Sequence, residues 1–283
     1  MSDSKFDIYE MVNTQIIDLL EAGTVPWHKP WSGGDSPKNL ISKKPYRGLN
    51  IMLLGSRPFA SPYWLTFNQA KKIKGAVNKG EKSTVVIFWK FLEVIDDKTG
   101  KPKTIPMLRY YRVFNVEQCT IPEGKIPESV IVENEIESID MCEEIVNAYD
   151  GPEIEYKAQQ AFYSPTPDII NMPRKETFES SEEFYSVLFH EMVHSTGHVS
   201  RLDRIKDHAA FRSAEYSKEE LVAEYGAAYL CAITGIENST IDNSASYIQN
   251  WLTALKNDKR LLVTACGAAQ RAIDYITNEK KEF

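Results

Sequence analysis

The chain has 283 residues, of which 42% are hydrophobic and 26% are charged. These proportions are those of a globular protein, and 14 glycines and 14 prolines are too few for a fibrous or broadly disordered chain. Because the length exceeds what one compact core usually holds, we expect two domains.

Signals for export and for disulfide bonding are missing from the sequence. No run approaches the roughly 18 apolar residues of a membrane span, and the first ten residues lack the basic-then-apolar order of a signal peptide. The four cysteines form no C-x-x-C pair, which argues against a disulfide framework and a cysteine zinc site. We therefore expect a cytoplasmic protein with reduced thiols and no membrane partner.

Charge is divided unequally along the chain. The formal net charge is −7, but residues 1–120 hold 18 Lys and Arg against 11 Asp and Glu, and are therefore positive. Residues 22–92 hold 12 Lys and Arg, only two acidic residues and four of the five tryptophans. This asymmetry indicates a polyanion-binding front part joined to an acidic rear part with a different function.

The front part begins with a predicted helix. Its apolar residues recur at helical spacing from Ser4, the expected N-cap, to about Ala22, and Gly23 is the expected left-handed stop. Residues 27–45 have no apolar period, so we expect a loop that carries cations and indoles.

Helix and strand signals alternate in the remainder of the front part. Thr66 and Gln69 fit a capping box for a short basic helix. Residues 83–95 and 107–116 are rich in β-branched and aromatic residues and flank a polar turn, which predicts a long hairpin. Two prolines and a glycine in residues 120–129 indicate a linker, so we place the domains at 1–125 and 130–283.

The rear part is predicted to be α+β. Short strands are expected in E-I-E-Y-K, Q-A-F-Y-S and D-I-I-N-M-P, which Pro and Gly residues separate. Helices are predicted for residues 136–149, from a Ser180 and Glu183 capping box to Gly197, from about Ser217, and once or twice within 245–279. Strands followed by helices within one segment indicate an α+β fold.

The strongest chemical motif is H-E-M-V-H at residues 190–194. On a helix, His190 and His194 share a face and can direct imidazole nitrogens to one zinc ion (Zn2+), about 2.0–2.1 Å from each. Glu191 is displaced by about 100°, so it is better placed to act as general base on water than to bind the metal. The chemistry would be amide hydrolysis; the alternative is a chance match on an amphipathic helix.

A catalytic zinc site needs one more protein ligand, and the candidates are Glu220, Glu224 and His198. Glu220 and Glu224 lie four residues apart, so one can bind zinc while the other bonds a ligand histidine; we favour Glu220 as the ligand. The alternative for Glu220 is a capping box with Ser217. His198 lies one residue after the glycine of H-x-x-H-x-x-G rather than three, so we interpret it chiefly as a polar residue at the cleft.

The basic front part combines the residue types that bind single strands. Lys and Arg neutralise phosphates, and aromatic rings stack on bases at about 1–3 kcal/mol per base without reading the sequence. For any single residue the alternative is a core aromatic ring or a solvated lysine. The predicted contacts to single-stranded nucleic acid are Lys29, Trp31, Lys38, Lys43, Lys44, Tyr46, Arg47, Lys71, Lys72 and Lys74.

Several segments carry a resemblance to a known family. The front part contains V-P-W-H-K-P-W, P-K-N-L-I-S-K-K-P-Y-R-G-L-N, W-L-T-F-N-Q-A, G-E-K-S-T-V-V-I-F and V-F-N-V-E-Q, and resembles the N-terminal domain of ArdC-type antirestriction proteins. The rear part contains Y-S-P-T-P-D-I-I-N-M-P, H-E-M-V-H-S-T-G-H, R-L-D-R and E-E-L-V-A-E-Y-G-A-A-Y-L, and resembles that family's zincin-like C-terminal domain.

The resemblance covers nearly the whole chain and has functional implications. It implies a protein of plasmids and other conjugative elements whose domain 1–125, of mixed α/β structure, binds single-stranded DNA and protects incoming DNA from restriction. Domain 130–283 would have a metallopeptidase fold of the gluzincin-like type. By position, His190, Glu191 and His194 match the zincin motif, and Glu220 matches an E-x-x-A pattern.

Two hypotheses about function remain. In the first, the protein is chiefly a DNA-binding antirestriction factor whose zinc domain is auxiliary or acts on host proteins, either a protein substrate or a host restriction component. In the second, it is chiefly a zinc-dependent protease that acts on a host protein and uses DNA for localisation.

Overall fold

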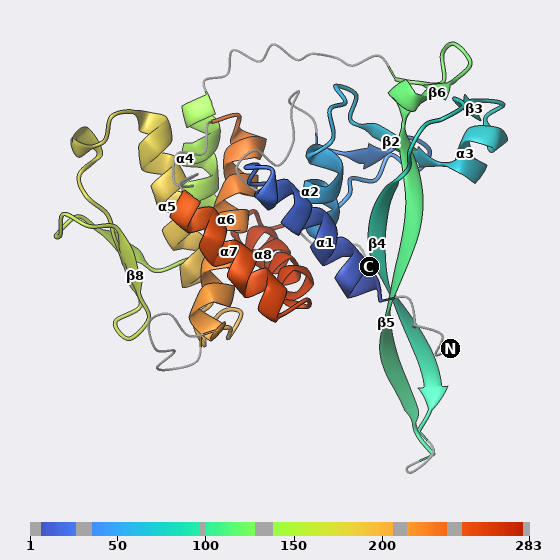
Figure 1. The fold of residues 1–283 in the computed structure, drawn as a ribbon. Coiled ribbons are helices and arrows are strands. Elements are labelled where there is room, and N and C mark those ends of the chain that lie inside the picture. The colour runs from blue at the N-terminus through green and yellow to red at the C-terminus, as the bar shows by residue number, and fades with distance from the viewer. Residues whose placement is uncertain are drawn as a thin grey trace.

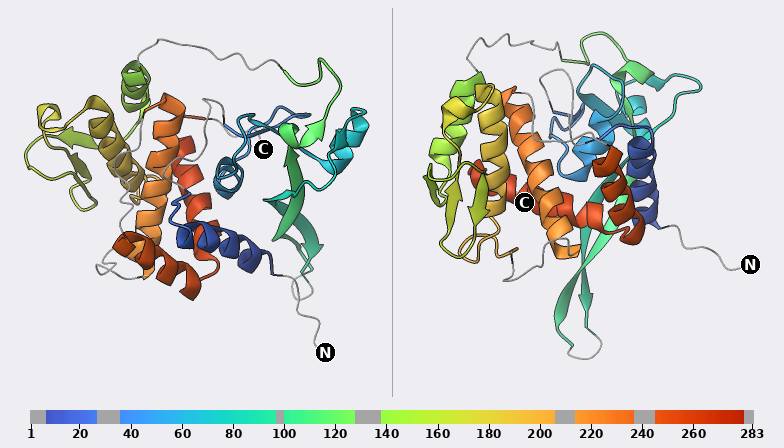
Figure 2. Two further views of the ribbon diagram at one scale, coloured as in Figure 1. Left: turned by 45° about the horizontal axis from the view of Figure 1, so that its top comes forward. Right: turned by 60° about the vertical axis from the view of Figure 1, so that its left-hand side comes forward.

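The protein combines helices and strands in an α+β fold, which confirms the expected fold class (Figure 1). Helices dominate the rear part, whereas a long hairpin projects from the front part (Figures 1 and 2). The computed structural model describes residues 7–26, 36–96, 100–127, 138–205, 214–236 and 245–279. Within these residues no helix is both long and apolar enough to cross a membrane.

The first helix, α1 (Ile8–Glu21), starts later than predicted. Its N-cap is Asp7, whose carboxylate accepts hydrogen bonds from the amides two and three residues on. The predicted cap, Ser4, lies outside the described residues, and its assignment was wrong because an aspartate nearer the apolar stripe is an equally good acceptor. Gly23 has a φ of +78°, so the predicted stop is confirmed.

The front part is built on a four-stranded sheet with the order β1-β2-β5-β4. Strands β1 and β2 are parallel, and the other neighbours are antiparallel. The capping box of Thr66 and Gln69 is present at the start of α3. The elements are β1 (Lys38–Asn39), α2 (Leu49–Gly55), β2 (Tyr63–Thr66), α3 (Phe67–Lys72), β3 (Ala76–Val77), β4 (Thr84–Ile95), β5 (Pro102–Asn115), η1 (Val116–Gln118) and β6 (Cys119–Thr120), with β3 and β6 paired in a small second sheet.

Strands β4 and β5 form the predicted hairpin. Their register runs without interruption from the pair Thr84 and Val113 to the pair Ile95 and Pro102. At the base of the hairpin, Val85, Val86 and Ile87 of β4 are buried in the core, whereas the outer half of the hairpin extends beyond the body of the molecule (Figure 1).

The rear part has a three-stranded sheet, ordered β7-β9-β8, and a group of packed helices. Helix α6 begins at Ala214, three residues before Ser217, so Ser217 is not its N-cap and a capping box with Glu220 is excluded. The elements are α4 (Ser138–Ala148), β7 (Glu153–Glu155), β8 (Phe162–Ser164), β9 (Ile169–Asn171), η2 (Lys175–Thr177), α5 (Ser181–Ser195), α6 (Ala214–Thr234), α7 (Ala245–Asn257) and α8 (Leu261–Ile276).

The predicted cap of α5 forms only in part. The Ser180 hydroxyl accepts a hydrogen bond from the Glu183 amide at 3.1 Å, as expected. The Glu183 carboxylate, however, accepts from the amide of Glu179 and not from that of Ser180. The capping box was therefore wrong in its second half, although the helix starts where it predicts.

One core joins the front and rear parts. Val12, Ile16 and Leu20 of α1 belong to the same apolar cluster as the helices α5 to α8. Two hydrogen bonds reinforce this core. The Tyr225 hydroxyl donates to the backbone carbonyl oxygen of Gly48 at 2.6 Å, and the side-chain amide of Asn13 donates to the backbone carbonyl oxygen of Leu255 at 2.7 Å. The domain boundaries at 1–125 and 130–283 stay a prediction.

Candidate metal centre

The site depends on a close approach between α5 and α6. Gly226 of α6 faces Val193 of α5, and a Cβ atom at position 226 would lie 2.7 Å from Val193 Cγ2. No side chain larger than hydrogen fits there without a shift. Because Val193 directly precedes His194, this packing brings the histidine face of α5 onto α6.

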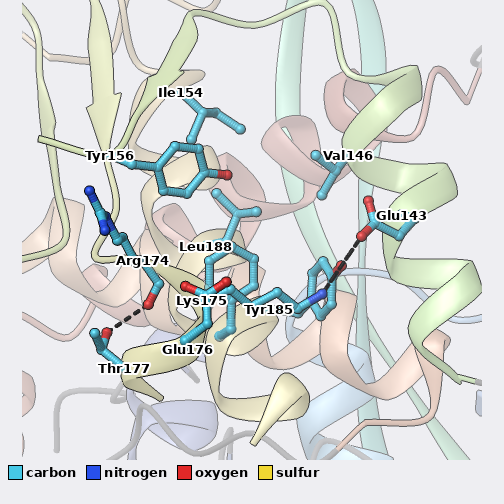
Figure 3. Close-up of a pocket in the computed structure, with 11 residues that line it drawn as sticks. Glu143, Val146, Ile154, Tyr156, Arg174, Lys175, Glu176, Thr177, Tyr185 and Leu188 are labelled. Atoms are coloured by element: carbon cyan, nitrogen blue, oxygen red, sulfur yellow. Dashed lines mark hydrogen bonds and ion pairs between the residues drawn. The ribbon is translucent and has the colours of Figure 1, made fainter.

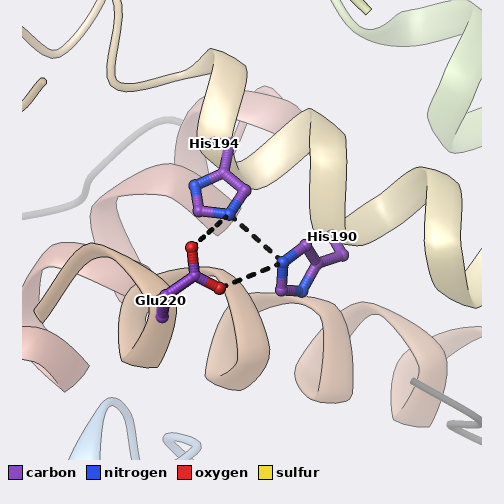
Figure 4. A group of neighbouring side chains, drawn as sticks. All are labelled: His190, His194 and Glu220. Carbon is purple, nitrogen blue, oxygen red and sulfur yellow. Dashed lines mark hydrogen bonds and ion pairs between the residues drawn. The ribbon is translucent and has the colours of Figure 1, made fainter. Parts of the chain in front are cut away.

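His190, His194 and Glu220 come together in that interface (Figure 4). The two imidazole Nε2 atoms are 3.1 Å apart. The Glu220 carboxylate places one oxygen 3.6 Å from Nε2 of His194 and the other 3.8 Å from Nε2 of His190. The three side chains thus direct their ligand atoms to one point.

These distances fit a tetrahedral metal ion. Ligands about 2.0–2.1 Å from a zinc ion are about 3.3–3.4 Å from one another, and the three measured separations lie close to that value. Two imidazoles and one carboxylate also make up a donor set that zinc prefers and that leaves a fourth position open. The residues present therefore fit a divalent metal.

A second carboxylate orients His194. The Glu219 carboxylate lies 3.5 Å from Nδ1 of His194, and Arg204 donates to the same carboxylate at 2.8 and 3.2 Å. Burial opposes ionisation of Glu219, but the bonds from His194 and Arg204 outweigh it and lower the Glu219 pKa. Nδ1 of His190, in contrast, is buried without a hydrogen-bond partner among the described residues.

The two arginines of the R-L-D-R segment, residues 201–204, cap the C-terminal end of α5. Arg204 donates to the carbonyl oxygen of Val193 at 2.9 Å, and Arg201 donates to that of Ser195 at 2.8 Å. These are among the last carbonyls of the helix, which lack intrahelical partners. Arg201 also donates to Asp168 at 3.0 Å, so the loop between β8 and β9 is tied to the same helix end.

Glu191 is buried beside the three candidate ligands. Its side chain is 9% exposed, and burial raises the pKa of its carboxyl above the ordinary value. The charge of His194 and a hydrogen bond from the backbone amide of Tyr163 oppose this rise. A buried carboxylate with a raised pKa beside a candidate metal site is suited to the role of a general base.

Two other predicted site residues do not belong to this group of three. Glu224, one turn further along α6, is not a member of the described cluster, and the carboxylate next to a histidine Nδ1 is Glu219. His198 bonds through Nδ1 to the hydroxyl of Ser200 at 2.7 Å and lies 3.7 Å from Asp168. The structure therefore groups Glu220 with the two histidines, and Glu224 and His198 are not members of that group.

The predicted nucleic-acid contacts fall into three groups. Lys29 and Trp31 lie outside the described residues. Tyr46 is only 6% exposed, and Arg47 is ion-paired with Asp274. The remaining predicted contacts are lysines of the front part, with Lys38 and Lys43 over the ring of Tyr63, Lys44 exposed, and Lys71, Lys72 and Lys74 exposed at the end of α3.

A pocket of about 850 Å³ lies next to α5 (Figure 3). Three of its polar side chains are linked: Lys175 donates to the Tyr185 hydroxyl at 3.0 Å, and that hydroxyl donates to Glu143. None of His190, His194 and Glu220 lines it.

Sequence reasoning missed Glu219, Arg201 and Arg204. The available signal was the R-L-D-R segment, since two arginines shortly after a helix can cap its last carbonyls. Glu219 carried no signal, because only the relative rotation of α5 and α6 decides which of two adjacent glutamates meets which nitrogen.

Comparisons with known proteins place the chain among relatives with two recognised domains. The family model for the N-terminal domain of the anti-restriction factor ArdC matches residues 6–114, and that for a zincin-like metallopeptidase matches residues 140–268. The protein y4eC of Sinorhizobium fredii (strain NBRC 101917 / NGR234) is 34% identical over 291 residues, which cover 98% of this chain and 93% of y4eC. A DNA primase TraC of Escherichia coli is 33% identical over 297 residues, 98% of this chain but 27% of the primase.

Solved structures extend the similarity to the whole fold. The metal-free crystal structure of the antirestriction protein ArdC from plasmid R388 has a TM-score of 0.76 and 38% identity, and the match covers 96% of this chain and 97% of that one. Its Mn(II)-bound structure has a TM-score of 0.76 and 37% identity, covering 98% and 100%. A zincin-like domain indicates a divalent metal cofactor, zinc in the first instance. The chain belongs to the ArdC antirestriction family, and its rear part is the zincin-like metallopeptidase domain.

Proposed function

We propose that this protein is an antirestriction factor of a mobile element that binds single-stranded DNA through its front part and holds a hydrolytic zinc centre in its rear part. The convergence of His190, His194 and Glu220 carries the second half of this proposal. The positive front part and membership of the ArdC family support the first half. Such a factor would meet incoming strands in the cytoplasm.

The chain's own residues have distinct roles in the proposed centre. His190, His194 and Glu220 would hold the metal, and Glu219 fixes the ring of His194 with its Nδ1 proton outward from the site. When bound, a divalent cation supplies Lewis acidity: it polarises a substrate carbonyl and makes water more acidic. Glu191 would take the proton that water gives up, which its raised pKa favours, and would then pass that proton on to a leaving amine.

The metal is zinc in this proposal, although manganese is a second candidate. The ArdC protein of plasmid R388 has a Mn(II)-bound structure, and the donor set of two imidazoles and a carboxylate also accepts that ion. Metal analysis of purified protein and competition between the two ions would decide which is bound under cellular conditions.

The proposed peptidase chemistry has a direct test. We expect Glu191→Ala to keep one zinc ion per chain and to lose all cleavage of an unstructured protein substrate such as casein. His190→Ala should lose the metal as well as the activity. Unchanged cleavage by Glu191→Ala would remove Glu191 as the base.

Strand binding is tested on the full chain. We expect gel retardation of single-stranded oligonucleotides at low salt, with an affinity that falls as salt rises by about 0.7 log units per log unit for each phosphate contact. A duplex of the same length should bind more weakly because its bases are stacked on one another. Absence of any retardation at low salt would refute the proposal.

The alternative function is a protease that acts on a host protein and uses DNA only for localisation. The support that Arg204 and Glu219 give to His194 favours it, because a purely vestigial centre would not need this network. Transfer of unmodified plasmid DNA into a restricting host separates the two. If Glu191→Ala still protects the DNA, DNA binding is the principal activity; if protection is lost with folding and strand binding intact, proteolysis is.

A further inference from the structure

The outer half of the β4–β5 hairpin has two different faces. Side chains alternate between the faces of a strand, and residues paired across two strands lie on the same face. By the observed register, Phe88 pairs with Arg109 and Lys90 pairs with Met107, whereas Trp89 and Phe91 point to the other side. The face that carries Phe88, Lys90, Arg109 and Tyr111 is called the cationic face below.

Two aromatic rings are exposed on the cationic face. Phe88 is 43% exposed and Tyr111 is 53% exposed. Their ring centroids are 5.5 Å apart with an interplanar angle of 72°, so each ring supports the other edge to face and part of each stays open to solvent. Rings of this kind are platforms on which an unpaired base can stack.

Two cations flank the rings. Arg109 of β5 lies directly across from Phe88 of β4, and Lys90 lies two residues beyond Phe88 along β4. Both side chains are exposed, and no ion pair joins either to another described residue. Nearer the tip of the hairpin, Lys103 is on the same face, but its Nζ lies 3.9 Å from the carboxylate of Asp96, which partly neutralises its charge. The acidic Glu93 lies on the opposite face.

This combination selects a single nucleic-acid strand as the occupant. A base needs an open ring and its phosphate needs a nearby cation, and the cationic face offers both within one pair of strand positions. A second copy of the chain fits poorly, because two-fold contact of this face with itself would oppose Arg109 and Lys90 to like charges. A duplex fits poorly because its bases are not free to stack.

We propose that single-stranded DNA crosses the β4–β5 hairpin on its cationic face, with bases on Phe88 and Tyr111 and phosphates at Arg109 and Lys90. The proposal rests on the proposed function, since it names the surface that performs strand binding. It also changes the set of contacts expected from the sequence: the ring of Tyr46 lies 6.3 Å from that of Phe88 but is buried at the base of the face.

The first experiment measures fluorescence anisotropy of a labelled oligodeoxythymidine with the full chain. We expect Phe88→Leu to weaken binding by about 5- to 150-fold, the range for loss of one stacked base, and Phe88→Trp to retain affinity. The matched control is Trp89→Leu, which removes an equally exposed ring from the next residue but from the opposite face. Its affinity should stay within about twofold of wild type.

The second experiment tests the cations and needs no change to the packing. We expect the double variant Lys90→Gln with Arg109→Gln to reduce the salt dependence of log affinity by about 1.4, because each phosphate contact on a single strand contributes about 0.7. Both side chains are exposed, so this variant should fold and remain interpretable even if Phe88→Leu does not.

The outcomes separate this surface from the wider function. If wild type binds and the Phe88 and cation variants bind as tightly, or if Trp89→Leu weakens binding equally, the assignment to the cationic face is overturned while strand binding stands. If Phe88→Leu instead changes the oligomeric state on size-exclusion chromatography without changing affinity, the face is a contact between copies and the proposal is wrong. If wild type binds no oligonucleotide, the proposed function fails.

Discussion

Replacement of Glu219 by glutamine is the sharpest test of how the metal centre is built. Glu219 does not belong to the group of candidate ligands, yet it is the only described carboxylate within 4 Å of Nδ1 of His194. Glutamine keeps the size of the side chain and can still accept a hydrogen bond through its amide oxygen. The substitution therefore removes charge and leaves the packing between α5 and α6 intact.

The expected magnitude follows from the role of the carboxylate. Loss of a carboxylate that orients a metal-binding histidine typically weakens metal affinity about 10- to 100-fold, or about 1.4–2.7 kcal/mol. We expect the upper part of this range because Arg204 donates two bonds to Glu219 and is itself only 11% exposed. Without the Glu219 charge, this buried guanidinium would repel the incoming cation.

The assay is zinc competition against a chromophoric chelator, with stoichiometry and affinity measured separately. Glu219→Gln should still bind one zinc ion per chain, whereas Glu220→Gln should lose stoichiometric binding. Glu144→Gln, the same change at an exposed position of α4, is the control for altered net charge. A Glu219→Gln affinity within twofold of wild type would refute the reasoning.

Three further outcomes test the surroundings of the two proposed sites. Gly226→Ala should lower the free energy of unfolding by about 1–3 kcal/mol in chemical denaturation and weaken zinc binding, because the added methyl group would force α5 and α6 apart. The hydrogen bond from Arg201 lowers the pKa of the Asp168 carboxyl, so the ionised carboxylate stabilises the fold above about pH 4, and this contribution is lost as the pH falls. Asp168→Asn should flatten the pH dependence of the free energy of unfolding in that acid range. An unchanged pH profile would contradict this reasoning. Replacement of Lys71, Lys72 and Lys74 by glutamine should weaken strand binding equally for all oligonucleotide sequences, and a sequence-selective loss would exclude simple contact with the backbone.

The pairing of the two candidate metal-binding histidines could be predicted from sequence because their geometry is local. Four-residue spacing on a helix places His190 and His194 on one face whatever the rest of the chain does. Glu220 was favoured over Glu224 from the sequence, but both lie on one face of α6, so residue spacing alone does not show which of them meets the histidines. The close contact at Gly226 helps to set how α6 lies against α5, and residue spacing does not reveal it.

The surface of the front part was harder to predict than its elements. The hairpin follows from β-branched and aromatic runs around a polar turn, which is a local pattern. Whether an aromatic residue is core or surface depends on what packs over it. Tyr46 was expected to stack on bases and is instead buried, whereas Phe88 and Tyr111 had no such assignment and are exposed. Composition indicated that this part contains rings and cations, but not which of them share a face.

Although a linker joins the front and rear parts, we expect them to unfold together, because a hydrogen bond crosses the junction between them. The carbonyl of Leu255 is in the last turn of α7, where it has no intrahelical partner, and Asn13 of α1 donates to it across the junction. Asn13→Ala would leave this buried oxygen unpaired, so we expect a loss of about 1–3 kcal/mol in the free energy of unfolding.

Because α1 and α8 share one apolar core, that loss of stability should affect the unfolding of the front and rear parts equally. Urea unfolding can show this with two probes, since four of the five tryptophans lie in the front part while most of the helix lies in the rear part. Fluorescence and far-ultraviolet circular dichroism should give the same midpoint, and Asn13→Ala should shift both equally. Two separated transitions in wild type would mean that the front and rear parts unfold as independent units and that the shared core contributes little to holding them together.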